Sequence, residues 1–166
     1  MRYSVAPARD VEQLESAREL FGEYIAWLDI AIASQGFAAE LARFPGDYAP
    51  PAGDLLLARN EHGEWLGCVG LRPLDIPGAC EMKRLYVREA ARGAGIGHAL
   101  AAAAVEQATA SGYSDFLLDT LPYMTAAQAI YQTLGFRSIP PYWDNAVPGI
   151  VYFGKRLQPD RADAWV

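Results

Sequence analysis

The sequence predicts a mixed α/β fold of the α+β type, with one central sheet flanked by helices. Two patterns predict this class. Short apolar runs bounded by turn residues, which are typical of strands, occur between residues 54 and 87 and again after residue 114. Longer segments with apolar residues at intervals of three and four positions, which are typical of helices, alternate with them. Because the 166 residues contain no internal repeat and no long linker, we expect a single domain over residues 1–166.

The N-terminal part of the chain predicts one strand and two helices. We expect the strand at Arg2–Ala6. Asp10 then opens a helical pattern, with Gln13 positioned to complete a capping box. The apolar positions of this pattern are Val11, Leu14, Ala17, Leu20, Phe21, Tyr24, Ile25, Leu28 and Ile32. Because glycine disfavours a helix interior, we expect this helix to end at Gly36 and a second one to span Phe37–Phe44.

The rest of the chain predicts an antiparallel meander followed by a β-α-β unit. Three strands joined by short turns are expected at Asp54–Arg59, Trp65–Pro73 and Ala79–Val87. After them we expect a helix at Gly95–Ala110, a strand at Asp115–Asp119, a helix at Thr125–Leu134 and a strand at Ile150–Leu157. A helix joins the third meander strand to the next strand, so these two strands should be parallel with a right-handed crossover. The expected sheet is therefore mixed but mostly antiparallel.

Composition disfavours several classes of function. The formal net charge of −6 argues against binding to nucleic acid or to an anionic membrane, because both need clustered Lys and Arg. The N-terminus lacks a signal-peptide pattern and no apolar run is long enough to span a bilayer, so we expect a cytoplasmic protein. Cys68 and Cys80 are expected as buried free thiols, with a disulfide between neighbouring strands as the alternative. With two histidines and no spacing typical of metal ligands, we expect no metal site.

A glycine-rich loop, Arg92–Gly97, lies between a predicted strand and a predicted helix. Its glycines let several backbone N–H groups turn toward one anion, and the helix N-terminus and Arg92 add positive charge, so the pattern favours a pyrophosphate ligand. A Walker A loop is excluded, because His98 follows the last glycine where lysine is required. Two alternatives stay open: a dinucleotide-binding loop, which Asp119 favours and the glycine spacing does not, and a purely structural turn.

Two motifs resemble signatures of one family. Residues 85–97 read Leu-Tyr-Val, four residues, then Arg-x-x-Gly-x-Gly, and resemble the acetyl-CoA signature of the GNAT superfamily of N-acyltransferases. Residues 127–136 read Ala-x-x-Ile-Tyr-x-x-x-Gly-Phe and are similar to that family's second signature. Two motifs in the family's order are more specific than either alone, and the order of elements agrees over almost the whole chain. One departure is Met124, where the family often has Asn.

The resemblance implies the GNAT acyltransferase fold, in which the two parallel strands splay apart and admit acetyl-CoA between them. Backbone groups of Leu85 and Val87 would pair with the pantetheine arm, and amides from Arg92 to His98 would hold the pyrophosphate. An N–H at a bulge near Leu85 would polarise the thioester carbonyl. The cofactor-binding residues that follow from the resemblance are Leu85, Tyr86, Val87, Arg92, Gly93, Ala94, Gly95, Ile96, Gly97, His98, Thr120, Ala127 and Tyr131.

The resemblance also implies two catalytic residues for acetyl transfer to an amine. Glu81 lies six residues before Val87, where similar members keep a base, and would take a proton from the acceptor directly or through water. The alternatives for Glu81 are an ion pair with Lys83 or Arg84 and a side chain that faces solvent. Tyr131 matches the tyrosine of the second signature and would protonate the departing sulfur, with packing as an aromatic side chain as its alternative role.

The resemblance places the acceptor opposite the cofactor, between the first helices and the last loops. Candidate residues are Gln35, Phe37, Glu40, Arg72, Tyr142, Trp143, Asp144 and Asn145. The aromatic and acidic members would suit a cationic amine, whereas Arg72 would suit a carboxylate. We therefore expect a small-molecule or peptide amine as acceptor, and an amino acid would carry both charges.

The predicted function is an acyl-CoA-dependent N-acyltransferase that moves acetyl to a primary amine by direct attack, as a monomer or homodimer. A ping-pong route through Cys68 or Cys80 is disfavoured, because neither cysteine has a histidine nearby in the sequence. Two alternatives stay open. One is an acetyl-CoA-binding sensor without catalysis, and the other is a nicotinamide-dependent reductase, which only Asp119 favours.

Overall fold

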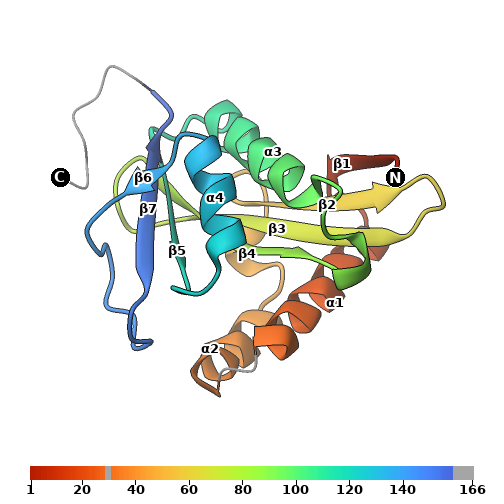
Figure 1. The fold of residues 1–166 in the computed structure, drawn as a ribbon, viewed down its shortest axis with the longest axis horizontal. Helices are drawn as coiled ribbons and strands as arrows, with labels where there is room; N and C mark the ends of the chain where they lie inside the picture. Colours follow the sequence, from red (N-terminus) through yellow and green to blue (C-terminus); the bar gives the residue numbers. More distant parts are fainter. Residues whose placement is uncertain (29–30, 159–166) are drawn as a thin grey trace.

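The computed structural model of the protein describes residues 1–28 and 31–158, with residues 31–35 described by their backbone alone. Its centre is a mixed seven-stranded sheet in the order β1-β2-β3-β4-β5-β7-β6 (Figure 1). The strands are β1 Tyr3–Pro7, β2 Asp54–Asn60, β3 Trp65–Pro73, β4 Ala79–Val87, β5 Asp115–Thr120, β6 Arg137–Ser138 and β7 Val151–Arg156. The described α-helices are α1 Val11–Leu28, α2 Ala31–Ala42, α3 Ile96–Ala110 and α4 Thr125–Thr133, with short 3₁₀ turns at Gly46–Tyr48 and Glu89–Ala91. The predicted class, a mixed and mostly antiparallel sheet flanked by helices, is confirmed.

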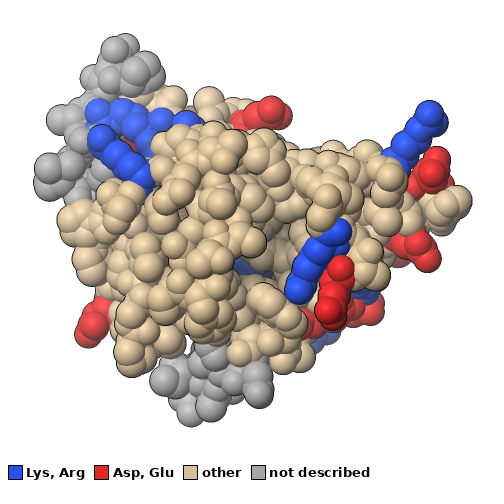
Figure 2. Space-filling model, in the orientation of Figure 1, with Lys and Arg blue, Asp and Glu red and all other residues tan. Residues whose placement is uncertain are grey.

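Helices cover both faces of the sheet because side chains of β2 alternate between two cores. Leu56 and Ala58 belong to the core under α3 and α4. Leu55 and Leu57 point the other way, into the core under α1. The face that carries α3 and α4 is mostly uncharged, with charged side chains gathered toward its edges (Figure 2). None of the described helices combines the length and hydropathy that a bilayer-spanning segment needs.

The predicted capping box at the start of α1 is confirmed. The N–H of Gln13 donates to Oδ1 of Asp10 at 2.8 Å, and the N–H of Asp10 donates to Oε1 of Gln13 at 3.3 Å. The predicted end of this helix is wrong, because α1 ends at Leu28 and Gly36 lies inside α2. A glycine in a helix interior costs only about 1 kcal/mol, and burial of the neighbouring Phe37 in the α1 core offsets that cost.

The edge strand β6 is absent from the predicted elements. It has only two residues, both exposed, which pair with Gly154 and Phe153 of β7. A strand of this length produces no alternating apolar pattern, so the sequence carries no signal for it.

The parallel strands β4 and β5 pair only at their beginnings. The pairing joins Ala79–Glu81 to Asp115–Leu117, and no pairing with β5 follows along the rest of β4. Strand β5 instead continues against β7 as far as Thr120. The two parallel strands therefore separate after Glu81, as the resemblance implied, and the sheet opens toward the end of β4.

A bulge interrupts β4 just after this separation. Cys68 of β3 pairs with Tyr86, whereas Gly70 pairs with Lys83, so a single β3 residue lies opposite both Arg84 and Leu85. Arg84 has φ = 59°, a left-handed conformation that costs a non-glycine residue about 1–2 kcal/mol. The predicted bulge at Leu85 is thus present in the strand.

Two glycine substitutions are expected to change stability in opposite directions. A Cβ on Gly67 of β3 would lie 2.4 Å from the backbone oxygen of Tyr86, so Gly67→Ala should lower the free energy of unfolding by about 1–3 kcal/mol. A Cβ on Gly22, inside α1, would meet no atom within 4 Å. Gly22→Ala should therefore raise the free energy of unfolding by about 0.5–1 kcal/mol. Urea denaturation measures both, and equal effects of the two substitutions would contradict this packing.

Candidate active site

A cavity of about 500 Å³, the glycine-loop cavity, lies between the end of β4, the loop that follows it, and the start of α4. Its lining residues are Tyr24, Trp27, Leu85, Tyr86, Val87, Ala91, Arg92, Gly93, Gly95, Ile96, Gly97, His98, Tyr123, Met124, Thr125, Ala126, Ala127 and Ile130. The wall is mainly apolar apart from the loop itself. It therefore combines an apolar trough with a cluster of backbone amides at one end.

The loop is shaped to present its backbone. Gly93 and Gly95 have φ values of 80° and 81°, which L side chains rarely adopt. Gly95 caps α3 without any side-chain hydrogen bond, so the first amides of this helix have no capping partner from a side chain. A Cβ on Gly97 would come within 3.2 Å of Ile130 across the cavity. These features fit an anion held by main-chain N–H groups at a helix N-terminus.

Arg92 lies at the mouth of this cavity with its side chain already oriented. Its Nε donates to the backbone oxygen of Val87 at 3.0 Å, and its guanidinium lies 4.7 Å from the ring centroid of Trp27. Both contacts leave the terminal nitrogens available to an anionic group on the loop.

A second cavity of about 590 Å³, the charged cavity, opens on the other side of the bulge. Its lining residues are Tyr24, Leu28, Gly36, Phe37, Glu40, Arg43, Pro45, Gly46, Asp47, Tyr48, Arg72, Leu74, Asp75, Ile76, Glu81, Lys83, Arg84, Asp119, Thr120, Leu121, Tyr142, Trp143, Asn145, Val147 and Ile150. Strand β4 passes from one cavity to the other, because Glu81 to Arg84 line this one and Leu85 to Val87 line the glycine-loop cavity. Tyr24 of α1 lines both cavities and marks where they meet.

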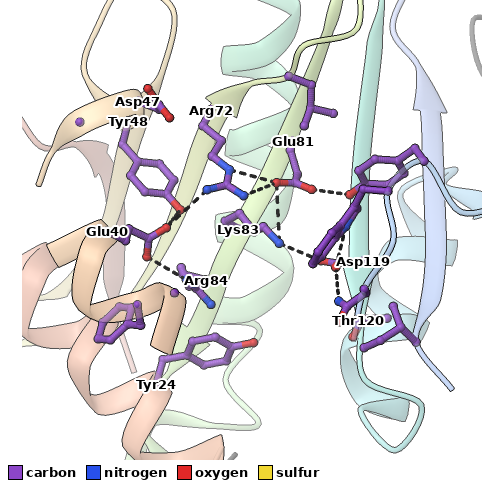
Figure 3. A pocket seen from close by; sticks show the side chains of 18 of the residues that line it. Tyr24, Glu40, Asp47, Tyr48, Arg72, Glu81, Lys83, Arg84, Asp119 and Thr120 are labelled. Carbon is purple, nitrogen blue, oxygen red and sulfur yellow. Dashed lines mark hydrogen bonds and ion pairs between the residues drawn. The ribbon is translucent and has the colours of Figure 1, made fainter. Parts of the chain in front are cut away.

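Glu81 is at the centre of the charged cavity although it is only 1% exposed. Arg72 donates to its Oε1 from Nε at 3.0 Å and from Nη2 at 2.9 Å, and Lys83 lies 3.7 Å from the same oxygen (Figure 3). The hydroxyl of Tyr142 donates to Oε2 at 2.5 Å. Burial, and then the charge of Glu81, raise the pKa of Tyr142, so this hydroxyl stays a donor. Two cations and one phenol thus balance and orient the buried carboxylate.

Asp119 forms the other end of the same network. Lys83 binds its Oδ1 at 2.9 Å, while Trp143 and Asn145 donate to Oδ2 at 3.1 Å and 2.9 Å (Figure 3). Burial alone would raise the pKa of Asp119, but Lys83 and these hydrogen bonds outweigh it and lower the pKa below its ordinary value. Asp119 therefore lines the charged cavity as a carboxylate and does not line the glycine-loop cavity, where a ribose ligand would need it.

Most predicted acceptor residues meet in the charged cavity. Its lining includes Phe37, Glu40, Arg72, Tyr142, Trp143 and Asn145. Asp144 is exposed and is not part of this lining. The side chains of Gln35 and Ile32 lie outside the described residues.

A sequence model of the acetyltransferase (GNAT) family matches residues 14–136. The chain belongs to the GNAT family. It is thus an acetyl-CoA-dependent N-acetyltransferase, and the two cavities lie within the matched region or directly beside it. Acetyl-CoA is the co-substrate typical of this family.

A relative agrees with this assignment, and solved structures agree with the fold. The GNAT protein is 38% identical over 149 residues to an uncharacterised N-acetyltransferase of Schizosaccharomyces pombe, covering 90% of this chain and 91% of that protein. Its fold is similar to a GNAT-family acetyltransferase of Staphylococcus aureus Mu50, with a TM-score of 0.75 at 21% identity, over 95% of this chain and 100% of that one. It is also similar to yncA of Salmonella typhimurium, solved with its cofactor acetyl-CoA, with a TM-score of 0.67 at 18% identity and 98% of each chain covered.

The cofactor residues predicted for this GNAT protein fall into three groups according to the cavity that they line. Those that line the glycine-loop cavity are Leu85, Tyr86, Val87, Arg92, Gly93, Gly95, Ile96, Gly97, His98 and Ala127. Ala94 and Tyr131 line neither cavity, and Thr120 lines the charged cavity instead. Thr120 lies at the end of β5, on the far side of the separation from β4, and its hydroxyl donates to the sulfur of Met124 at 3.7 Å.

Tyr131 of this acetyltransferase is a buried aromatic side chain of α4. It is 6% exposed, and its ring packs 6.0 Å from Phe136 and 6.1 Å from Phe153, measured between centroids. Burial, with smaller contributions from Tyr24 and Asp119, raises the pKa of its phenol. The phenol therefore stays protonated over the ordinary pH range. Tyr24 was not among the site residues predicted from the sequence, although it lines both cavities. Burial raises the pKa of its phenol to about 12.

Proposed function

We propose that this protein transfers acetyl from acetyl-CoA to the primary amine of a small molecule, amino acid or peptide by direct attack of the amine on the thioester. One observation carries the proposal: the two cavities meet at the bulge of β4, so that an apolar trough ending in backbone amides adjoins a polar cavity built around Glu81. A bound co-substrate and a bound acceptor would then approach each other beside Leu85 and Tyr24.

The glycine-loop cavity fits acetyl-CoA. Amides from Arg92 to His98, together with the Arg92 guanidinium, would hold the pyrophosphate at the start of α3. The edge of Leu85–Val87 that faces away from β3 is not paired with β5 and would hold the pantetheine arm as an added strand. The Leu85 N–H at the bulge would donate to the thioester carbonyl. Acetyl-CoA supplies the acetyl group, and its sulfur leaves as a thiol.

We assign Glu81 the role of general base. An ammonium with a pKa of about 10 must lose its proton before it can attack, and a carboxylate within the cavity accepts that proton directly or through a water molecule. Arg72 and Tyr142 fix the carboxylate in one orientation, which reduces the reorganisation needed at the moment of transfer. This role is in addition to the ion pairs that Glu81 makes with Arg72 and Lys83.

We assign Tyr131 the role of general acid toward the departing sulfur. Its raised pKa keeps the phenol protonated until the sulfur needs the proton. Its packing against Phe136 and Phe153 is compatible with this role, because a fixed ring orients its hydroxyl. Among the described residues, Tyr131 lines neither cavity, but Tyr24, which lines both, lies near enough to contribute to its raised pKa, so the role requires the sulfur to approach Tyr131 beside Tyr24.

A direct transfer is better supported than a route through a cysteine. Both cysteines are buried free thiols, as predicted. Burial raises the pKa of the Cys68 and Cys80 thiols, which disfavours the thiolate that an acyl-cysteine step needs. Cys68 also uses its S–H as a donor to the backbone oxygen of Arg84.

The test is release of CoA thiol from acetyl-CoA in the presence of a broad panel of primary amines. We expect turnover with at least one class of amine and none with the matching tertiary amines, because acetylation needs an N–H to lose. Tight acetyl-CoA binding without turnover on any amine would favour a sensor. A cytoplasmic location, a monomeric or homodimeric state, and the lack of a metal requirement stay predictions from the sequence.

A further inference from the structure

We propose that the acceptor is a free amino acid, and that Arg84 binds its carboxylate. This inference rests on the proposed function and specifies its acceptor. The residue expected from the sequence for a carboxylate was Arg72, but Arg72 is already occupied by Glu81 through two hydrogen bonds and lies 3.6 Å from Glu40. The carboxylate site therefore has to be sought elsewhere in the charged cavity.

The bulge aims Arg84 into this cavity. In a regular strand, consecutive side chains point to opposite faces, so Arg84 would point away from the face that Lys83 occupies. The left-handed φ of 59° at Arg84 breaks this alternation, and both side chains line the charged cavity. A strained backbone conformation at a non-glycine residue typically persists where it serves a site. Here its consequence is a third cation, after Arg72 and Lys83, beside the junction of the two cavities.

The guanidinium of Arg84 is oriented but only partly used. Its Nε donates to Oε2 of Glu40 at 3.2 Å (Figure 3). Its Cζ lies 5.4 Å from the ring centroid of Phe37. In the described part of the chain, neither Nη1 nor Nη2 has a hydrogen-bond partner, although the side chain is only 17% exposed. Lys83, in contrast, is bound to Asp119 and Glu81. The two terminal nitrogens of Arg84 are adjacent and largely shielded from solvent. Their spacing matches the two oxygens of a carboxylate.

The charges of the network favour a zwitterion over a simple cation or anion. The ion-pair network at the centre of the cavity contains three carboxylates, on Glu40, Glu81 and Asp119, and three cations, on Arg72, Lys83 and Arg84; the other charged lining residues, Arg43, Asp47 and Asp75, lie outside this network. An amino acid brings equal and opposite charges, so it adds no net charge to this balanced set. A purely cationic amine would leave the two terminal nitrogens of Arg84 without a partner, and a dianion would exceed its single free guanidinium edge.

The position of Arg84 along β4 restricts the acceptor further. Arg84 directly precedes Leu85, whose N–H is assigned to the thioester, and follows Glu81 by three residues. An acceptor whose carboxylate lies on Arg84 and whose amine lies between Glu81 and Leu85 must carry both groups. A free amino acid is the smallest amine that does so.

The test compares kcat/KM for amino acids with that for their amides and their decarboxylated amines, in the thiol-release assay. For wild type we expect the carboxylate to raise kcat/KM about 30- to 100-fold, the usual value of a charge-assisted bidentate contact. Arg84→Met should lower kcat/KM for the amino acid about 30- to 100-fold, to about the value for its decarboxylated amine. Arg84→Gly, which suits the left-handed φ, should have the same effect in a protein that keeps its fold. Arg18→Met, an exposed arginine of α1 outside both cavities, is the matched control and should keep the preference.

The outcomes separate the two proposals. Turnover of amines with no preference for a carboxylate, or a preference that Arg43→Met removes and Arg84→Met does not, would overturn the Arg84 assignment and leave the acetyltransferase proposal standing. A dipeptide preferred over every free amino acid would do the same. Binding of acetyl-CoA with no turnover on any amine, amide or amino acid would overturn both.

Discussion

Replacing Glu81 by glutamine is expected to lower kcat by about 10²- to 10³-fold, the range for loss of a general base. Glutamine has nearly the same size as glutamate and keeps an oxygen that can accept a hydrogen bond from Arg72, so the cavity should stay intact. Its amide cannot act as a base, because it does not accept a proton. The measurement is steady-state thiol release at saturating acceptor, together with acetyl-CoA binding by calorimetry. Binding should be unchanged, because Glu81 does not line the glycine-loop cavity.

The matched control for this substitution is Glu106→Gln, on the exposed side of α3. It makes the same chemical change outside both cavities and should leave kcat at the wild-type value. Partial recovery of Glu81→Gln turnover as the pH rises would support the assignment, since more of the amine is then already deprotonated. A wild-type kcat for Glu81→Gln at neutral pH would contradict it and leave Glu81 as an ion-pair partner of Arg72 and Lys83.

Replacing Tyr131 by phenylalanine is expected to lower kcat about 100-fold where chemistry limits the rate. The ring and its contacts with Phe136 and Phe153 are retained, so the free energy of unfolding should change little. Pre-steady-state measurement of thiol release separates the chemical step from product release. Tyr113→Phe is the control: it removes a phenol that donates to Ala52 at 2.6 Å, outside both cavities, and should leave kcat unchanged.

The pH dependence gives a second test of Tyr131. Because burial raises its pKa above the ordinary value of about 10, its acid form persists to higher pH than that of an exposed tyrosine. The wild-type rate should therefore rise with pH as the acceptor amine deprotonates, and should show no fall from loss of the phenol proton below about pH 10. An unchanged kcat in Tyr131→Phe would instead assign the residue to packing alone.

The parts of the site that backbone geometry dictates could be predicted from the sequence. The glycines of Arg92–Gly97 predict a loop that exposes its backbone amides. The structure has left-handed φ values at Gly93 and Gly95. The bulge near Leu85 and the separation of β4 from β5 followed from the resemblance and are present. The helix-breaking inference at Gly36 failed because packing of Phe37 outweighs the intrinsic cost of one glycine in a helix.

The parts of the site that depend on tertiary neighbours could not be predicted. Nothing in the sequence around Arg84 signals a left-handed residue, since glycine and asparagine are the usual markers. Whether Arg72 or Arg84 keeps free donors depends on Glu40 and Glu81, which come from α2 and β4. Thr120 lies in the charged cavity because β5 follows β7 away from β4, a long-range pairing that local patterns do not record.

The central claim is that main-chain amides at the start of α3 hold the diphosphate of acetyl-CoA. A crystal structure of the protein with CoA tests it most directly. We predict phosphate oxygens within hydrogen-bond distance of amides between Arg92 and His98, with the pantetheine arm along Leu85–Val87 and the sulfur toward Tyr24. A diphosphate bound at any other part of the molecule, with these amides making no contact to it, would contradict the claim.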